Sequence, residues 1–212
     1  MTANVAHNED ASFVTQTHAL LDAHGALLLS LARRSIEHTW ETSATWEVDL
    51  ATVPPELAAT GACFVTLHKH GQLRGCIGSP EAWRPLATDV VENANRAAFH
   101  DPRFAPLRAD ECDGLKVHIS VLSPAHPFIF MDEADLLAKL NAGTDGLIIE
   151  DTSHRALFLP SVWAQLPQPE QFLAHLKAKA GLSPDHWSAD FKAWRFVTAE
   201  TGASWSDIQH IA

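Results

Sequence analysis

The chain has 212 residues and a formal net charge of −11, with 46% hydrophobic and 19% charged residues. This composition allows a sizeable core and excludes global disorder, and the length suits one large domain or two small lobes. The acidic balance argues against nucleic-acid or anionic-membrane partners, because both require an excess of Lys and Arg. The longest strongly apolar stretch, residues 26–32, is too short to cross a bilayer, and the polar N-terminus does not resemble a signal peptide. We therefore expect a cytoplasmic protein.

The first half of the chain predicts helices around a hairpin. Residues 1–11 are polar and acidic, which is typical of a flexible tail, and residues 12–38 carry apolar side chains at helical spacing. Two runs rich in β-formers, residues 62–68 and 72–78, flank a turn at residues 69–71, which predicts a β-hairpin. A helix is predicted over residues 85–99, because Pro85 suits a first turn and Pro102 ends the pattern.

The second half predicts shorter elements of both kinds. Residues 115–122 alternate between apolar and polar side chains, as a half-buried strand does. Further elements are a helix at 132–140 with Asp132 as N-cap, a hairpin formed by 146–150 and 155–159, a helix at 168–179, a strand at 193–197 and a C-terminal tail at 201–212. Antiparallel hairpins without βαβ repetition predict an α+β domain over residues 12–200, with a larger and a smaller lobe.

The stretch from Leu73 to Gly78 reads Leu-Arg-Gly-Cys-Ile-Gly. Alternate residues of a strand share a face, so we expect Arg74 and Cys76 on one side, and Leu73 and Ile77 toward the core. A guanidinium beside a thiol favours the thiolate, which makes Cys76 a candidate nucleophile. The alternative is a packed thiol, because cysteine is among the residue types most often buried.

Glycines and arginines surround this stretch. Gly75 and Gly78 would let a backbone or a ligand approach closely, although a strand glycine can simply mark a bulge. Asp101 and Arg103 flank a proline, so they form either a self-contained clamp or an anion site that faces Cys76. The window from residue 74 to 108 holds five arginines, which either converge on a carboxylate or phosphate or make ordinary surface ion pairs: Arg74, Arg84, Arg96, Arg103 and Arg108.

The cysteines and histidines predict neither a metal site nor a disulfide framework. Cys112 brings the number of cysteines to three, an odd count. Cys63 and Cys76 share a face if the hairpin turn has two residues and face apart if it has three. His68 and His70 lack an evident third ligand, and no nucleotide-binding motif occurs, so no metal and no cofactor are predicted.

The hairpin resembles the signature of a known family. Phe64-Val65-Thr66-Leu67 followed by Gly71-x-Leu73-Arg74-Gly75-Cys76-Ile77-Gly78 is similar to the signature of the AMMECR domain family, whose bacterial and archaeal members are called AmmeMemoRadiSam system protein A. Further matches are Asp101-Pro102-Arg103-Phe104, Asp145-Gly146-Leu147-Ile148-Ile149-Glu150 and Arg155. The resemblance runs from about residue 14 to 197 and implies an α+β fold of two subdomains with a groove at the Arg-Gly-Cys strand.

Two functional hypotheses follow from this resemblance. The family has no settled activity, but its bacterial members are associated with a radical S-adenosylmethionine protein and a Memo-like protein. In the first hypothesis Cys76 and Arg74 are catalytic in thiol or modification chemistry on an anionic small molecule or partner group, with binding residues Gly75, Gly78, Asp101, Arg103, Glu150 and Arg155. In the second, the chain is a non-catalytic binding module whose Arg-Gly-Cys groove is structural.

Overall fold

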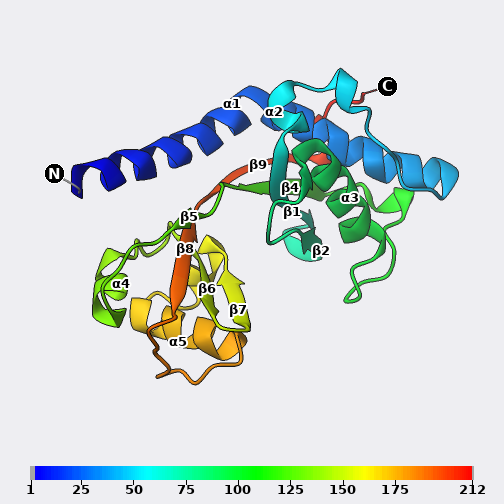
Figure 1. Ribbon diagram of the computed structural model, residues 1–212. Coiled ribbons are helices and arrows are strands. Elements are labelled where there is room, and N and C mark those ends of the chain that lie inside the picture. Colours follow the sequence, from blue (N-terminus) through cyan, green and yellow to red (C-terminus); the bar gives the residue numbers. More distant parts are fainter. Residues whose placement is uncertain (1–2, 212) are drawn as a thin grey trace. The chain divides into compact units, whose positions relative to one another are not determined.

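The computed structural model describes residues 3–211, with side chains from Val14 onward, and it divides into two compact units (Figure 1). The first unit comprises the chain up to Leu122 together with the residues from Ala199 onward, and the second spans Ser123–Thr198. Both combine helices with antiparallel strands, so the predicted α+β class is confirmed. Among the described residues, none of the helices is both long and apolar enough to cross a membrane.

The first unit is built on an antiparallel sheet with the strand order β2-β1-β4-β9, and β3 pairs with β1. Its strands are β1 (Thr60–Lys69), β2 (Gln72–Gly78), β3 (Arg84–Pro85), β4 (Leu115–Leu122) and β9 (Thr198–Ser204). Its helices are α1 (Ala3–Thr42), α2 (Pro55–Ala58) and α3 (Leu86–Phe99), with 3-10 turns η1 (Leu50–Thr52), η2 (Ala109–Glu111) and η4 (Trp205–Asp207). The predicted hairpin, the helix at 85–99 and the strand at 115–122 are confirmed.

The core of this unit lies on one face of the sheet. Along β1, Cys63, Val65 and Leu67 are fully buried, whereas Thr66 and His68 on the other face are only half-buried. Helices α1 and α3 pack on the buried face, since their apolar side chains belong to the same core cluster as these strand residues. The alternation of apolar and polar residues along the strand therefore determines which face of the sheet the helices cover.

The turn between β1 and β2 has two residues, and it is followed by a β-bulge. His70 and Gly71 have φ values of 50° and 80°, as a type I′ turn requires. Leu67 pairs with Gly75 but His68 pairs with Leu73, so Arg74 is an extra residue on β2. The bulge shifts the alternation, and the expectation that Leu73 faces the core is wrong, because its side chain is exposed.

The same bulge separates the two hairpin cysteines. A two-residue turn in a regular ladder would place Cys63 and Cys76 on one face. Because of the extra residue, Cys76 pairs with Thr66 on the half-buried face, whereas Cys63 points into the core. Both thiols are free.

Helix α3 approaches β2 closely at a glycine. A Cβ built on Gly75 would lie 2.1 Å from the carbonyl oxygen of Ala97, a distance that no real side chain tolerates. Gly75 therefore serves the contact between a strand and a helix backbone, which is one of the two roles that the sequence allowed.

The ends of the first unit differ from the predicted tails. Residues 3–11 continue α1, and the predicted tail at 201–212 is wrong, because β9 and η4 occupy most of it. Trp205 and Ile208 are buried, and Nη1 of Arg33 on α1 donates hydrogen bonds to both of their carbonyl oxygens, at 2.8 and 2.7 Å. A buried guanidinium with two carbonyl acceptors thus fastens the C-terminal segment to α1.

The second unit is a smaller sheet with the strand order β5-β8-β6-β7. Its elements are β5 (His126–Pro127), α4 (Glu133–Lys139), β6 (Gly146–Asp151), β7 (His154–Phe158), η3 (Pro160–Ala164), α5 (Pro169–Lys179) and β8 (Lys192–Phe196). Asp132 caps α4 by accepting a hydrogen bond from the Asp135 amide, as predicted. In its core, the rings of Trp163 and Phe172 stack with centroids 3.8 Å apart.

Replacing Gly75 by Ala should destabilise the first unit by about 1–3 kcal/mol, because the added methyl group forces β2 and α3 apart. The exposed neighbour Gln72→Ala is the control and should change little. Urea unfolding of both variants measures the difference, and equal midpoints would show that the strand and the helix do not pack at Gly75.

Candidate functional site

Cys76 lies on the sheet face that the two helices leave uncovered. Its thiol is half-buried, and its sulfur accepts a hydrogen bond from the Thr66 hydroxyl at 3.3 Å across the β1–β2 pair. This contact holds the sulfur on the half-buried face of the hairpin. Thr66 was not singled out from the sequence, because only the register of the hairpin reveals that it is opposite Cys76.

The backbone of Cys76 is held by the segment that follows α3. β2 is an edge strand, and its Cys76 amide donates to Oδ2 of Asp101 at 2.9 Å. The carbonyl oxygen of Cys76 accepts from Nη2 of Arg103 at 3.3 Å. Asp101 and Arg103 thus bind the two exposed backbone groups of this residue, as a neighbouring strand would.

Asp101 and Arg103 also bind each other. Nε and Nη2 of Arg103 donate to the two carboxylate oxygens of Asp101 at 2.9 and 2.7 Å. These bonds hold the pKa of Asp101 well below its usual value. The clamp and the contact with Cys76, which the sequence presented as alternatives, are therefore both present.

Arg74 points to a different partner. Its Nε and Nη2 donate to the two carboxylate oxygens of Glu111 at 3.2 and 3.1 Å, and the hydrogen bond from Arg74 lowers the pKa of Glu111. The sequence predicts that Arg74 contacts Cys76, but its hydrogen bonds are made with Glu111. The bulge at Arg74 changes the direction in which its side chain leaves the strand. The arginine that touches Cys76 is Arg103.

The space beside the two glycines of the motif is occupied by other atoms of the chain. A Cβ on Gly78 would lie 2.2 Å from the Phe64 ring, just as one on Gly75 would strike the helix backbone. Both positions make room for packing within the chain, and their role in binding a substrate stays a prediction.

Glu150 and Arg155 lie in the second unit. They are opposite each other in the β6–β7 ladder and form a cross-strand ion pair. Arg155 also lies over the Trp194 ring, with its guanidinium carbon 5.3 Å from the centroid. Through these contacts, Glu150 and Arg155 stabilise the pairing of strands in the smaller sheet.

The arginines between residues 74 and 108 do not converge on one site. Arg84 pairs with Asp89 and Glu92, and Arg108 pairs with Asp110, in addition to the two pairs described above. Four of the five therefore bind carboxylates of the chain, which favours the interpretation as ion pairs.

Two histidines lie beside Thr66 on the same sheet face. The rings of His68 and His118 meet edge to face, with centroids 5.4 Å apart. Burial, followed by the charge of His68, lowers the pKa of His118. Over residues 3–211, no group of three or more His, Cys, Asp or Glu side chains is arranged to hold a metal ion.

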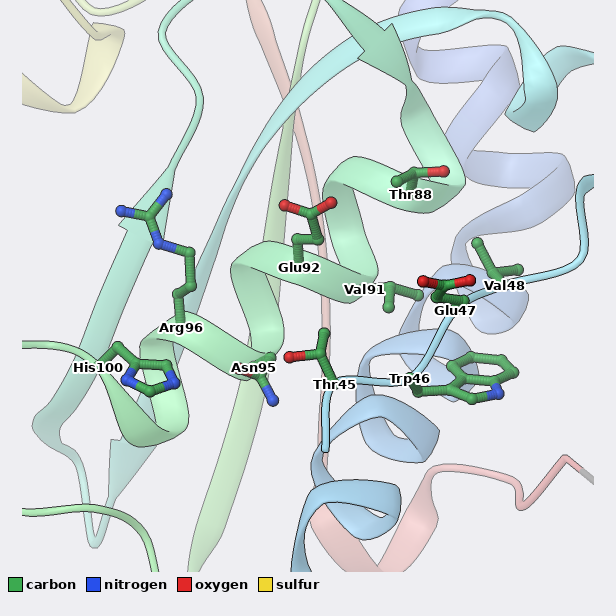
Figure 2. Close-up of a pocket in the computed structure, with 10 residues that line it drawn as sticks. All are labelled: Thr45, Trp46, Glu47, Val48, Thr88, Val91, Glu92, Asn95, Arg96 and His100. Carbon is green, nitrogen blue, oxygen red and sulfur yellow. The ribbon is translucent and has the colours of Figure 1, made fainter. Parts of the chain in front are cut away.

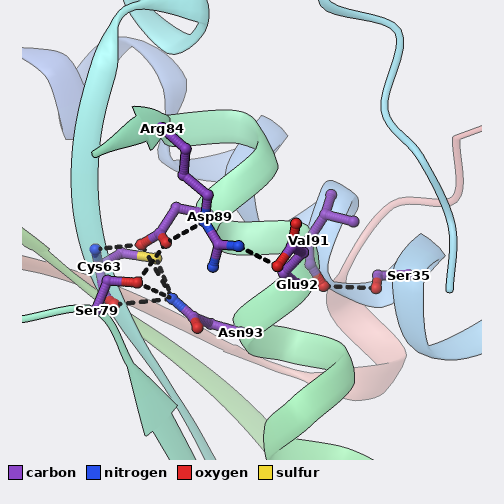
Figure 3. A network of polar contacts seen from close by, with 8 residues as sticks. All are labelled: Ser35, Cys63, Ser79, Arg84, Asp89, Val91, Glu92 and Asn93. Atoms are coloured by element: carbon purple, nitrogen blue, oxygen red, sulfur yellow. Dashed lines mark hydrogen bonds and ion pairs between the residues drawn. The ribbon is translucent and has the colours of Figure 1, made fainter. Parts of the chain in front are cut away.

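Cys63 belongs to a buried polar network at the far end of the hairpin (Figure 3). The fully buried carboxylate of Asp89 accepts from the Cys63 amide at 2.8 Å, from Ser79 at 2.5 Å and from Nε of Arg84 at 2.7 Å. Burial raises the pKa of the Cys63 thiol well above its usual value, and Asp89 raises it further. This thiol is therefore a structural group.

Replacing Asp89 by Asn should cost about 1.5–3 kcal/mol of unfolding free energy, because the buried Arg84 loses its fully buried acceptor and keeps only Glu92 as a counter-charge. Asp110→Asn removes the partner of an exposed arginine and should leave the urea midpoint unchanged. Equal effects of the two substitutions would contradict the role assigned to the network.

The stability that Asp101 supplies should depend on pH. Because its pKa is lowered on folding, its contribution is complete above the unfolded pKa of about 4 and is lost as the pH falls through the folded value. The difference in urea midpoint between the native chain and Asp101→Asn should be constant from about pH 5 to 8 and shrink in stronger acid. A difference that grew on acidification would refute this assignment.

Comparison with known proteins places this geometry in a family. The profile of the AMMECR1 family matches residues 29–201. A Thermococcus onnurineus protein is 40% identical over 192 residues, covering 86% of this chain and 91% of that protein. A Methanothermobacter thermautotrophicus protein is 37% identical over 174 residues, covering 81% and 90% respectively.

A solved structure agrees with the match. The crystal structure of an uncharacterized protein from Pyrococcus horikoshii superposes with a TM-score of 0.72 at 37% identity, covering 84% of this chain and 90% of that one. The family match covers more than half of the chain and includes the hairpin, the clamp and the second unit. The chain belongs to the AMMECR1 family.

Proposed function

We propose that Cys76 is a reactive thiol used in thiol or modification chemistry on an anionic substrate or partner group. The observation that carries the proposal is the hydrogen bond from the Thr66 hydroxyl to the Cys76 sulfur, on a residue whose backbone is fixed on both sides by the Asp101–Arg103 clamp. A nucleophile must be held in place, and these contacts fix both the sulfur and the backbone of Cys76.

Arg103 is the residue assigned to anion binding. Its side chain is 53% exposed although it binds Asp101, and the hydrogen bonds described use Nε and Nη2. The donors on Nη1 are suited to a carboxylate or phosphate beside the thiol. Arg74, which is held by Glu111, acts in this proposal by shaping the strand.

The proposed partners are a radical S-adenosylmethionine protein and a Memo-like protein in the cytoplasm. This assignment rests on the family resemblance, and the three free cysteines fit a reducing compartment. In this arrangement the chain supplies the thiol and the other two proteins supply further steps.

A second candidate is a non-catalytic binding module. It is favoured by the two motif glycines, whose space is filled by Ala97 and Phe64 and not by a ligand. Replacing Cys76 by Ser separates the candidates in purified mixtures with the two partner proteins. Retained binding with lost product formation supports chemistry, whereas retention of both supports the module.

The three cysteines should be alkylated by iodoacetamide in a fixed order in the native protein. Cys76 should react first, then Cys112, whose pKa is raised by burial, and Cys63 only on unfolding. Peptide mass spectrometry over time at neutral pH measures the three rates. Faster reaction at Cys112 than at Cys76 would remove the case for an activated thiol.

Thr66→Val tests the activating contact. Losing one hydrogen bond of about 1 kcal/mol should slow alkylation of Cys76 roughly fivefold and leave the rate at Cys112 unchanged, which makes Cys112 the internal control. Thr66→Ser keeps the hydroxyl and should restore the rate. An unchanged Cys76 rate in Thr66→Val would contradict the proposed role of the hydroxyl.

A further inference from the structure

A pocket lies in the first unit, between one face of α3 and the segment at residues 45–48 that follows α1 (Figure 2). Its volume is about 750 Å³, which lies within the range of small-molecule sites. The residues that line it include none of those that contact Cys76. The pocket is therefore independent of the proposed thiol site.

One end of the pocket carries uncompensated positive charge. Arg96 is exposed, and among the described residues it is the arginine of the 74–108 window without a carboxylate partner. His100 follows it by four positions and lines the same end of the pocket (Figure 2). The two side chains offer several donors to an anionic group.

The facing wall carries the opposite charge. Glu47 is exposed, and no cation of the described chain pairs with it. Glu92, the other acid of the lining, is already bound by Arg84. The half-buried Trp46 ring, which lies beside Glu47 in Figure 2, supplies apolar surface.

We propose that this pocket binds a small zwitterion, namely an amino acid or short peptide with free termini. The carboxylate would bind Arg96 and His100, the ammonium group would bind Glu47, and an apolar side chain would lie on Trp46. A ligand with a single charge leaves one wall unpaired, whereas a zwitterion neutralises both walls.

The test is calorimetric titration of the full chain with leucyl-leucine and with its N-acetylated and C-amidated forms. The free dipeptide should bind saturably, and each capped form should bind about tenfold more weakly or worse, because a charged hydrogen bond is lost. Arg96→Gln and Glu47→Gln should each weaken binding of the free dipeptide by about the same factor. Arg108→Gln, an exposed arginine outside the pocket, is the matched control and should leave binding unchanged.

Three results would overturn the proposal. One is the absence of saturable heat with the free dipeptide at millimolar concentration. Another is equal binding of the N-acetylated form, which would show a simple anion site. The third is equal weakening by Arg96→Gln and Arg108→Gln, which would show a non-specific charge effect. Cys76→Ser should not change binding, so failure here is distinguishable from failure of the proposed thiol chemistry.

Discussion

The carboxylate of Asp101 determines how the candidate site is built. It accepts the amide of Cys76 on the edge strand and at the same time binds Arg103, which returns a hydrogen bond to the carbonyl of the same cysteine. Without it, the edge of β2 would present unpaired backbone groups at the motif. The conformation of Cys76 therefore depends on a segment 25 positions further along the chain.

This arrangement requires α3 to lie very close to β2. Gly75 permits the approach, because a side chain there would strike the backbone at Ala97. The helix ends at Phe99, and the following residues reach the strand edge within two positions. Gly75 and Asp101 therefore act together. Gly75 lets α3 approach β2, and Asp101, just after the end of α3, binds the backbone of β2. Gly75 and Asp101 thus support the position of Cys76, for which we propose the function of a reactive thiol.

Much of the fold could be predicted from the sequence, whereas much of the site could not. The strand at 115–122 and the helix at 85–99 follow from local periodicity, and local rules were sufficient for them. The bulge at Arg74 is one extra residue in a ladder, and the neighbouring Gly75 allowed a bulge in this strand without fixing its place or the register. That single residue decides that Leu73 is exposed, that Cys63 and Cys76 face apart, and that Arg74 meets Glu111. The pairing of Asp101 with Arg103 could be predicted as a candidate clamp. That the clamp binds the backbone of Cys76 could not, because this is a contact between residues far apart in the sequence.

Amide hydrogen exchange at Cys76 tests the central claim most directly. We expect this edge-strand amide to be protected in the native chain and to exchange rapidly in Asp101→Ala, while the amides of β4 in the middle of the sheet keep their protection in both proteins. Rapid exchange at Cys76 in the native chain, or equal protection in the two proteins, would contradict it.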